Sequence, residues 1–327
     1  MNILVTGAAG FIGSHVCEHF IKLGNVVIGL DNFDDFYPKN IKQLNLAGLL
    51  NNDNFHFYEA DIRDYSALNN IFSSNKIDYV IHLAAKAGVR PSIKEIFGFY
   101  DVNVNGTINL LEVMRIHAVN KMIFASSSSV YGNNKKVPFS ENDFVDNPIS
   151  PYASTKKSGE LLCHVYSHLY GMHITCLRFF TVFGPRQRPD LAIYKFTRLI
   201  DEGKPIPFFG NGSSSRDYTY VLDILNGIGC AFNKLDGYNI FNLGESKLTN
   251  LNELVQMLEK ALGKKAILNK LPSQPGDVKV TYADISKARS LIGYNPTYNM
   301  TSGINEFIKW YLQNKELLQD EAKMSEY

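Results

Sequence analysis

The chain has 327 residues, 45% of them hydrophobic and 20% charged, which is too long for one small core. Its 33 lysines and arginines nearly balance 32 aspartates and glutamates, and a net charge of +1 provides no broad basic field for nucleic acid or anionic lipid. No apolar run reaches the roughly 18 residues of a membrane span. Four dispersed cysteines favour free thiols over disulfides or a zinc site. We therefore expect a cytoplasmic protein with no metal, nucleic-acid or membrane partner.

Short apolar runs alternate with helical patterns through the first part of the chain. They predict strands at 3–6, 26–30, 55–60, 79–83 and 122–126, and helices near 12–23, 66–72 and 104–117. Strands that are apolar on both faces and alternate with helices indicate a parallel sheet covered by helices. We therefore predict an α/β fold with a doubly wound, Rossmann-type sheet, whose ligand crevice lies at the carboxyl ends of the strands.

The pattern changes after about residue 180, because prolines and glycines crowd the stretch from 185 to 212. The clearest later elements are a helix near 251–262, an amphipathic helix from 302 to about 313, and a strand near 239–243. We predict two domains, residues 1–180 and a smaller α/β lobe formed mainly by 181–327. A segment near 217–243 is expected to return to the first domain.

A glycine-rich turn at residues 7–13 follows the first strand and opens the first helix. Gly7 permits a tight turn, Gly10 lets the backbone approach a pyrophosphate, and Gly13 lets helix and strand pack closely. The helix N-terminus then offers free N–H groups to the anion. Asp31 ends the second strand, where a carboxylate accepts hydrogen bonds from the adenosine ribose and repels a 2′-phosphate. The pattern predicts a dinucleotide site that prefers NAD to NADP.

Tyr152 and Lys156 lie four residues apart and would project from one face of a helix. A phenol with a pKa near 10 is a poor base at neutral pH, but a neighbouring ammonium and a positive nicotinamide ring favour the phenolate. Lowering its pKa to near 7 requires roughly 4 kcal/mol. Four serines, 126–129, end the fifth strand, and a hydroxyl there can share a hydrogen bond with the substrate oxygen being oxidised.

These motifs occur in the order found in a known family. With Asp31-Asn32, Asp61-Ile62, 82–85, 103–107 and 178–185, the chain resembles, over nearly its whole length, the extended short-chain dehydrogenases/reductases, and within them the nucleotide-sugar epimerases. The resemblance implies the catalytic residues Ser127, Tyr152 and Lys156. It implies NAD contacts from Gly7, Gly10, Phe11, Ile12, Gly13, Asp31, Asn32, Asp61, Ile62, Leu83, Ala84, Ala85, Lys86, Asn103, Tyr152, Lys156, Phe179 and Val182.

The resemblance also narrows the reaction. The related dehydratases carry an Asp-Glu pair where this chain has Ser128-Ser129, and the related decarboxylases carry a Glu at the position of Ser129. Without a carboxylate there, what remains is reversible oxidation at C4 of a UDP-sugar, that is, epimerisation. The stretch 184–192, GPRQRPDLA, looks most like the UDP-glucuronate 4-epimerases, although Lys86 stands where those enzymes are expected to carry Gln.

For the substrate, the resemblance implies contacts from Phe209, Arg216 and Asp277, and the expected chemistry adds Ser127, Ser128, Ser129, Thr181, Arg186 and Arg188. Either loop arginine, Arg186 or Arg188, could bind a sugar carboxylate or a phosphate, or form a surface ion pair instead. UDP-glucose or UDP-N-acetylglucosamine remains an alternative substrate. Net oxidation, decarboxylation and a non-catalytic NAD-sensing role remain alternative functions. The family also implies a homodimer formed by the helix near 104–117 and the helix after Tyr152.

Overall fold

A seven-stranded parallel sheet forms the larger part of the computed structural model, which describes residues 1–272 and 280–318. The strand order is β11-β6-β5-β4-β1-β2-β3. The order reverses between β1 and β4, which creates the crevice expected of a doubly wound sheet. The strands are β1 (Asn2–Thr6), β2 (Val26–Asp31), β3 (Phe55–Glu59), β4 (Tyr79–His82), β5 (Lys121–Ser127), β6 (His173–Phe179) and β11 (Tyr238–Leu243).

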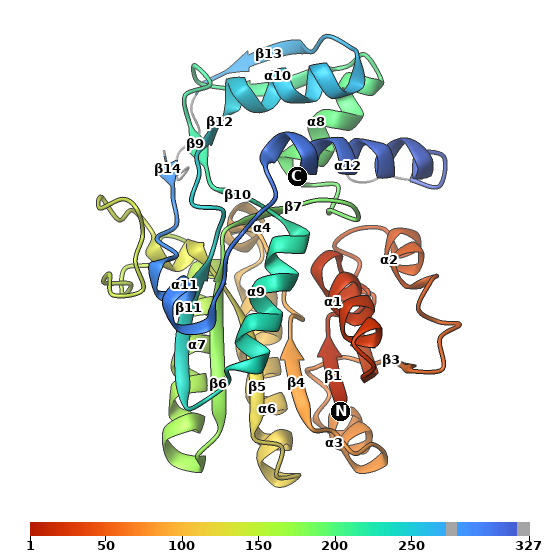
Figure 1. Cartoon of the computed structure of the whole chain (residues 1–327), viewed down its shortest axis with the longest axis vertical. Helices are drawn as coiled ribbons and strands as arrows, with labels where there is room; N and C mark the ends of the chain where they lie inside the picture. The colour runs from red at the N-terminus through yellow and green to blue at the C-terminus, as the bar shows by residue number, and fades with distance from the viewer. Residues whose placement is uncertain (273–279, 319–327) are drawn as a thin grey trace.

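Helices cover both faces of this sheet (Figure 1). On one face lie α1 (Phe11–Lys22), α2 (Lys39–Leu46) and α9 (Val221–Asn233). On the other face lie α3 (Tyr65–Ser74), α6 (Gly106–Ile116) and α7 (Pro151–Tyr170). The short helices α4 (Val89–Lys94) and α5 (Ile96–Tyr100) and the π-helical turn η1 (Asp101–Asn105) precede α6, and α11 (Ser286–Ile292) packs beside β11.

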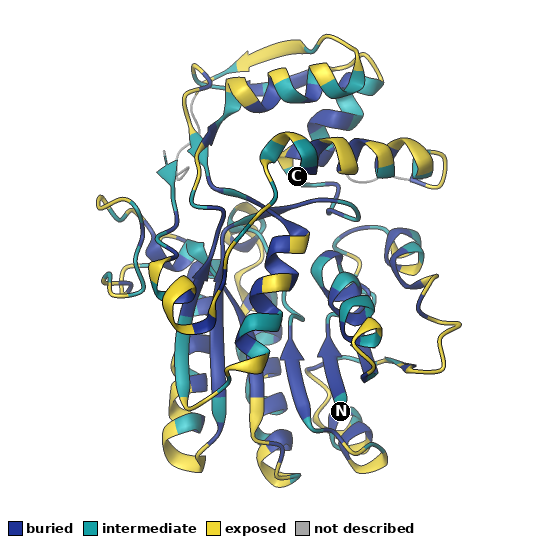
Figure 2. Cartoon of the chain, viewed as in Figure 1, coloured by how far each residue is buried: buried dark blue, intermediate teal, exposed yellow. Residues whose placement is uncertain are grey.

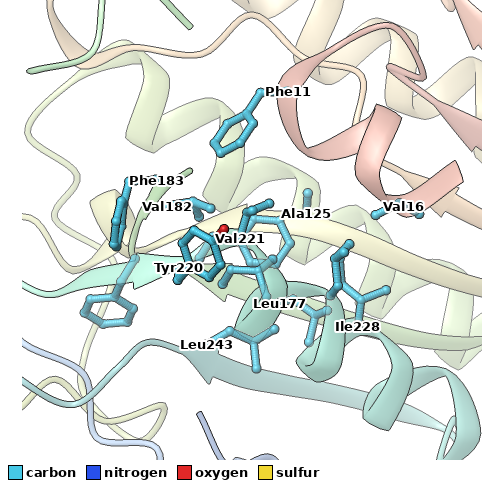
Figure 3. Packing of buried hydrophobic residues seen from close by; sticks show 14 of the residues in the cluster. Phe11, Val16, Ala125, Leu177, Val182, Phe183, Tyr220, Val221, Ile228 and Leu243 are labelled. Carbon is cyan, nitrogen blue, oxygen red and sulfur yellow. The ribbon is translucent and has the colours of Figure 1, made fainter. Parts of the chain in front are cut away.

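The central strands of the sheet are mostly buried (Figure 2), and buried apolar side chains form two clusters, one on each face of the sheet. In the cluster under α1 and α9, Val16, Leu177 and Ile228 are fully buried, and Figure 3 shows them converging between helices and strands. Central parallel strands must be apolar on both sides because helices cover both faces. The burial pattern of β4, in which all four residues are buried, follows this rule.

A smaller group of elements lies beyond the carboxyl ends of the strands (Figure 1). Its helices are α8 (Ala192–Asp201), α10 (Leu251–Leu262) and α12 (Met300–Asn314), and its strands are β8 (Pro205–Phe209), β9 (Ser215–Arg216), β12 (Thr249–Asn250), β13 (Ile267–Leu271) and β14 (Val280–Thr281). The parallel pair β7 (Thr181–Phe183) and β10 (Tyr218–Tyr220) connects it to the sheet. A capping box between Asn250 and Glu253 fixes the start of α10, and Gly263 in the left-handed conformation ends it.

The predicted doubly wound fold is confirmed, and each predicted strand and helix matches an element to within a few residues. The strand expected at 239–243 is β11, at the edge of the sheet beside β6. Two elements that position the site were not identified from the sequence: the strand β6 and the helix α2. The structure does not itself test the division into domains at residue 180, which stays a prediction.

His82, at the end of β4, is buried and bonded on both ring nitrogens. Its Nδ1 lies 2.7 Å from the Thr6 hydroxyl and its Nε2 lies 3.1 Å from the Thr107 hydroxyl. Burial, followed by the nearby Lys156 charge, lowers the pKa of His82 to about 3. The imidazole is therefore neutral at physiological pH and ties β1, β4 and α6 together, a structural role.

This lowered pKa makes the protein sensitive to acid. In the unfolded chain His82 takes up a proton near its ordinary pKa of 6.5, whereas in the folded chain it resists protonation. The contribution of neutral His82 to the free energy of unfolding is therefore fully present above pH 6.5 and declines as the pH falls toward 3. Between pH 7.5 and 5 the loss amounts to about 2 kcal/mol for this one residue. Urea unfolding of His82→Gln is expected to show a smaller decline over that range than the parent protein. Equal declines would contradict the assignment.

Candidate active site

The glycine-rich turn between β1 and α1 packs too tightly for a side chain at Gly7 or Gly13. Gly7 has a positive φ of 73°, and its N–H donates to the Leu30 carbonyl at 2.8 Å. A Cβ on Gly13 would lie 2.0 Å from the Gly7 carbonyl oxygen, so only glycine fits there. The turn therefore brings the first residues of α1, including Phe11 and Ile12, to the edge of a cavity. This is the geometry that a dinucleotide diphosphate requires.

Asp31 sits at the carboxyl end of β2, immediately beside the glycine turn. Its Oδ2 accepts a hydrogen bond from the Ala9 N–H at 3.0 Å, and its Oδ1 accepts one from the Phe33 N–H at 2.9 Å. Burial raises the pKa of Asp31, while the Lys42 ammonium acts in the opposite direction. The two backbone donors fix the carboxylate in one orientation, which preorganises it to accept hydrogen bonds from a ribose. The turn and Asp31 together fit NAD.

A cavity of about 530 Å³ runs along the carboxyl ends of the sheet strands and reaches the smaller group of elements. Most of the residues predicted from the sequence to bind cofactor or substrate line it, although they come from many separate segments. They are Gly7, Gly10, Phe11, Ile12, Gly13, Asp31, Asn32, Asp61, Ile62, Leu83, Ala84, Ala85, Lys86, Ser127, Ser128, Ser129, Tyr152, Lys156, Phe179, Thr181, Val182, Arg188 and Arg216.

Three predicted residues lie outside the lining of this cavity. Asn103 holds the Lys86 backbone, since its Oδ1 accepts from the Lys86 N–H at 2.8 Å and its Nδ2 donates to the Lys86 carbonyl at 2.9 Å. Arg186 forms an ion pair with Glu18 at 2.5 Å. The Phe209 ring lies against the Arg90 guanidinium, 5.5 Å away. Their proposed ligand contacts stay predictions, and the predicted residue Asp277 lies outside the described residues.

Ser127 and Tyr152 meet at the centre of the cavity lining. Ser150 caps α7 by accepting from the Ala153 N–H at 3.1 Å, which places Tyr152 in the first turn of the helix. The Ser127 side chain forms a hydrogen bond with the Tyr152 phenol that favours the phenolate. The Ser129 hydroxyl in turn donates to the Ser127 hydroxyl at 2.9 Å. The three hydroxyls form one chain that ends on the Tyr152 phenol.

Lys156 follows one helical turn later and is also buried. Its Nζ donates to the Ala125 carbonyl at 2.7 Å, and burial lowers its pKa to about 8. The expected low pKa of Tyr152 is not found in the chain alone. Burial raises it above its ordinary value, and only the Ser127 hydrogen bond and the Arg188 charge oppose that rise. The reason is that the buried phenolate loses its hydration, while the Lys156 ammonium is bonded elsewhere.

Arg188 lines the cavity on the side of the smaller lobe. Its Nε and Nη2 donate to the two Asp190 carboxylate oxygens at 3.0 and 2.9 Å, and its guanidinium lies 5.1 Å from the centre of the Phe36 ring. Asp190 does not use the third nitrogen, Nη1. A cation held in this way, whose charge also acts on Tyr152, is suited to an anionic group near the reacting hydroxyl.

The structure adds cavity residues that the sequence analysis missed. Several belong to the β2–α2 segment, namely Asp34, Phe36, Tyr37 and Lys42, and others to later loops, namely Gly88, Val89, Phe139, Ile149, Leu191 and Thr281. The Lys42 ammonium donates to the Asp34 carbonyl, and Lys86 pairs with Asp34 at 3.7 Å and with Glu95 at 3.1 Å. The one available signal was the acidic and aromatic stretch 31–37, which directly follows the predicted second strand.

The search for metal ligands and for a membrane span gave negative results. Within 1–272 and 280–318, no three His, Cys, Asp or Glu side chains gather as metal ligands would, although two pairs of histidines lie four residues apart. The same part of the chain contains no helix that is long and apolar enough to cross a membrane.

The fold and the cavity define a class of protein: a Rossmann-type enzyme with a Ser–Tyr–Lys set beside a dinucleotide turn. The chain belongs to the family described as GDP-mannose 4,6 dehydratase, whose model matches residues 4–307. It is 45% identical over 317 residues to the UDP-glucuronate 4-epimerase of Thermodesulfobacterium geofontis (strain OPF15), covering 97% of this chain and 98% of that protein.

Solved structures of 4-epimerases are also similar to this chain. The chain matches the UDP-glucuronic acid 4-epimerase from Bacillus cereus, crystallised with UDP-glucuronic acid and NAD, with a TM-score of 0.90 and 40% identity over 96% of this chain and 99% of that one. It also matches the UDP-glucose 4-epimerase of Thermotoga maritima, crystallised with UDP-glucose, with a TM-score of 0.89 and 35% identity over 96% of this chain and all of that one (100%).

Proposed function

We propose that this protein is an NAD-dependent UDP-sugar 4-epimerase that interconverts UDP-glucuronate and UDP-galacturonate. The observation that carries the proposal is the hydrogen-bonded set of Ser129, Ser127 and Tyr152, in one cavity with the glycine-rich turn. The similar enzymes from Thermodesulfobacterium geofontis and Bacillus cereus, whose names specify UDP-glucuronate, support the choice of substrate.

The proposed chemistry assigns a separate task to each side chain. Tyr152 takes the proton from the sugar C4 hydroxyl and returns it after the sugar has turned its other face. Ser127 shares a hydrogen bond with the same oxygen, and Lys156 provides positive charge beside the phenol. When bound, NAD supplies the hydride acceptor for C4 and a positively charged ring. The glycine-rich turn and Asp31 would hold the dinucleotide, as the fit described above supports.

The cavity also favours epimerisation over the elimination that the family description names. Removing water from a sugar requires an acid and a base, but Ser128 and Ser129 supply only hydroxyls at that position. The Ser129 hydroxyl is directed to Ser127 instead. The 4-keto form of a uronic acid is a β-keto acid that loses CO₂ readily. The enzyme must therefore fix the carboxylate, and Arg188, Ser128, Ser129 and Thr181 are placed to do so.

Product analysis tests the proposal. The purified protein is incubated separately with UDP-glucuronate, UDP-glucose and UDP-N-acetylglucosamine, and NAD⁺ is added only if nothing reacts. We expect UDP-galacturonate from the first sugar and little turnover of the other two. Conversion of the neutral sugars instead would reject the carboxylate specificity, a pentose nucleotide would show decarboxylation, and NADH formed in proportion to product would show net oxidation.

The proposed division of labour follows the two groups of elements. Residues 1–180, with the segment 217–243, form the NAD-binding domain, and 181–327 form most of the UDP-sugar lobe. The cavity lining supports this division, because the glycine turn comes from the first part whereas Arg188, Leu191 and Arg216 come from the second. Isothermal titration of Arg216→Ala with UDP and with NAD tests it. Weaker UDP binding with unchanged NAD binding is expected.

We further propose that two copies pair through α6 and α7. On α7, Leu161, Val165 and Leu169 are 55%, 44% and 61% exposed and repeat every four residues, and Ile116 on the adjacent α6 is 54% exposed. Such a stripe is the face by which helices associate in bundles. Size-exclusion chromatography with light scattering should give a dimer for the parent protein and a monomer for Val165→Glu. Leu312→Glu, at an exposed position on α12, is the matched control that should stay dimeric.

The cytoplasm is the proposed location, since all four cysteines are free thiols, a state typical of a reducing compartment. Cell fractionation tests this assignment, and recovery of the protein in an oxidising compartment would reject it.

A further inference from the structure

A fully buried ion pair lies directly behind the catalytic residues. Glu160 on α7 and Arg178 on β6 both have side chains only 1% exposed. The pair is bidentate, since Nε of Arg178 donates to Oε1 and Nη2 to Oε2 of Glu160, each at 2.8 Å. The Ser126 hydroxyl also donates to Oε1 of Glu160, at 2.7 Å. Ser126 immediately precedes Ser127, so the Glu160 carboxylate holds the end of the strand that presents the reactive hydroxyl.

The same network continues across the sheet. Nη1 of Arg178 donates to the Tyr131 hydroxyl at 3.0 Å, and that hydroxyl donates to Oδ1 of Asn242 at 2.7 Å. Nδ2 of Asn242 then donates to the Phe139 carbonyl at 2.9 Å. The carboxyl ends of β5, β6 and β11 are thereby fixed relative to one another. Each donor named in this hydrogen-bond network has an acceptor, so we expect the network to be rigid although it is polar.

Glu160 also lies one helical turn after Lys156. Burial lowers the pKa of Lys156, and Glu160 is one of three neighbours, after Cys163 and Cys176, that act in the opposite direction. The Lys156 ammonium lies 5.3 Å from the centre of the Phe124 ring on β5. The titratable side chains that interact with this ammonium come from three elements. They are Glu160 and Cys163 on α7, Cys176 on β6 and His82 on β4. His82 is neutral at physiological pH, and burial raises the pKa of the Cys176 thiol well above its ordinary value. Glu160 is the carboxylate of this set.

We propose that Glu160 is a positioning residue for the epimerisation: it anchors the strand end that carries Ser127, and its carboxylate lies one helical turn from Lys156. Arg178 holds the Glu160 carboxylate in place through two hydrogen bonds and balances its charge. This inference rests on the proposed roles of Ser127 and Lys156, and it assigns a function to a pair that would otherwise count only as part of the core.

The charge of Lys156 can be followed without any substrate. The full-length protein, saturated with added NAD⁺, is labelled with ¹³C at the lysine Cε, and two-dimensional NMR spectra are recorded across a pH series. The Lys156 signal is assigned by its absence from the Lys156→Arg variant. Its titration midpoint gives the pKa of Lys156 and so shows how strongly the neighbouring groups favour the ammonium form. This measurement does not require the sugar substrate to be known.

Three variants separate charge from folding. Glu160→Gln keeps the shape but removes the charge, and Glu160→Gln/Arg178→Met also removes the buried cation that would otherwise be left unpaired. Arg178→Met alone keeps the carboxylate. We expect the Lys156 midpoint to fall by about one pH unit in Glu160→Gln, where the Arg178 charge is left unbalanced, and by less in the double variant, which removes both charges of the pair. In Arg178→Met the midpoint should stay at or above that of the parent, although the protein loses stability.

The outcomes decide the inference directly. An unchanged Lys156 midpoint in the two Glu160 variants, with only their thermal stability reduced, would show a purely structural pair and overturn it. A fall in all three variants would assign the effect to general loosening and overturn it as well. The proposed function fails separately, when the parent protein converts none of the UDP-sugars, while the NMR titration still decides the role of Glu160.

Discussion

Tyr152→Phe is expected to reduce the turnover of UDP-glucuronate by about a thousandfold, because proton transfer by a positioned side chain contributes factors of 10² to 10⁴. The substitution removes one oxygen and leaves the ring, which packs edge-on against Phe99 at 6.3 Å between ring centres. NAD content and melting temperature should therefore stay near those of the parent. Initial rates of UDP-galacturonate formation, with both substrate and enzyme varied, measure the effect.

Ser127→Ala provides the matched comparison. Losing its hydroxyl removes one hydrogen bond to the reacting oxygen and also the hydrogen bond that lowers the pKa of Tyr152. We expect a loss of about a hundredfold at neutral pH. The rate depends on the phenolate, so it falls as the pH drops below the pKa of Tyr152, and in Ser127→Ala this limb should move to higher pH. A Tyr152→Phe enzyme that retains a tenth of the parent activity would reject the phenol as the base.

The sheet was predictable because its elements are simple. In β1, β4 and β5 the buried polar residues Thr6, His82 and Ser126 stand at or near the carboxyl end of the strand, so the apolar run before them stays unbroken and stands out from the flanking sequence. The strand β6 escaped notice because it contains buried polar residues. Thr175 and Arg178 are each 1% exposed, and the partners that satisfy Arg178 come from α7 and from Tyr131, far away in sequence. Buried polarity becomes intelligible only when its partners are seen.

The helix α2 was missed for a related reason. Its inward face mixes the apolar Ile41 and Leu46 with Lys42 and Asn45, which are 5% and 1% exposed, so polar residues interrupt the apolar stripe by which helices are identified. Asn45 donates to the Ala9 carbonyl in the glycine-rich turn at 3.0 Å, and Lys42 lines the cavity. A helix that packs beside the site therefore carries polar residues at positions where other helices carry apolar ones, because the site requires polar groups there.

The predicted site residues show what motifs can and cannot convey. Motif positions at strand ends, such as Asp31 and Ser127, line the cavity because the carboxyl ends of parallel strands meet at one edge. Asn103 and Arg186 are in equally specific motifs, yet the first secures the Lys86 backbone and the second pairs with Glu18. A motif identifies a position at which a particular residue type is expected. It does not tell which group the side chain contacts, because that depends on the direction in which the side chain points.

Arg188→Leu is expected to lower kcat/KM for UDP-glucuronate by about a hundredfold. The carboxylate of the bound sugar would then be buried without its partner, which costs about 2 to 5 kcal/mol. UDP-glucose, whose sugar is uncharged, has no carboxylate to leave unpaired, so its slower turnover should change much less. Leucine keeps apolar contact with Phe36, which now lies against the guanidinium. The quantity to compare is the ratio of the two kcat/KM values, because the Arg188 charge also lowers the pKa of Tyr152 and its loss slows both sugars at neutral pH.

Asp190→Asn is the matched control for this prediction. Asp190 now takes two of the Arg188 nitrogens, and replacing its charge leaves the guanidinium in place with more positive charge for an incoming anion. The KM for UDP-glucuronate should therefore fall relative to that for UDP-glucose, opposite in direction to Arg188→Leu. The two variants shift the substrate preference in opposite directions only if the sugar carboxylate meets Arg188. An equal loss with both sugars in Arg188→Leu would mean that its role is to act on Tyr152, and the carboxylate contact would then have to come from the serines and Thr181.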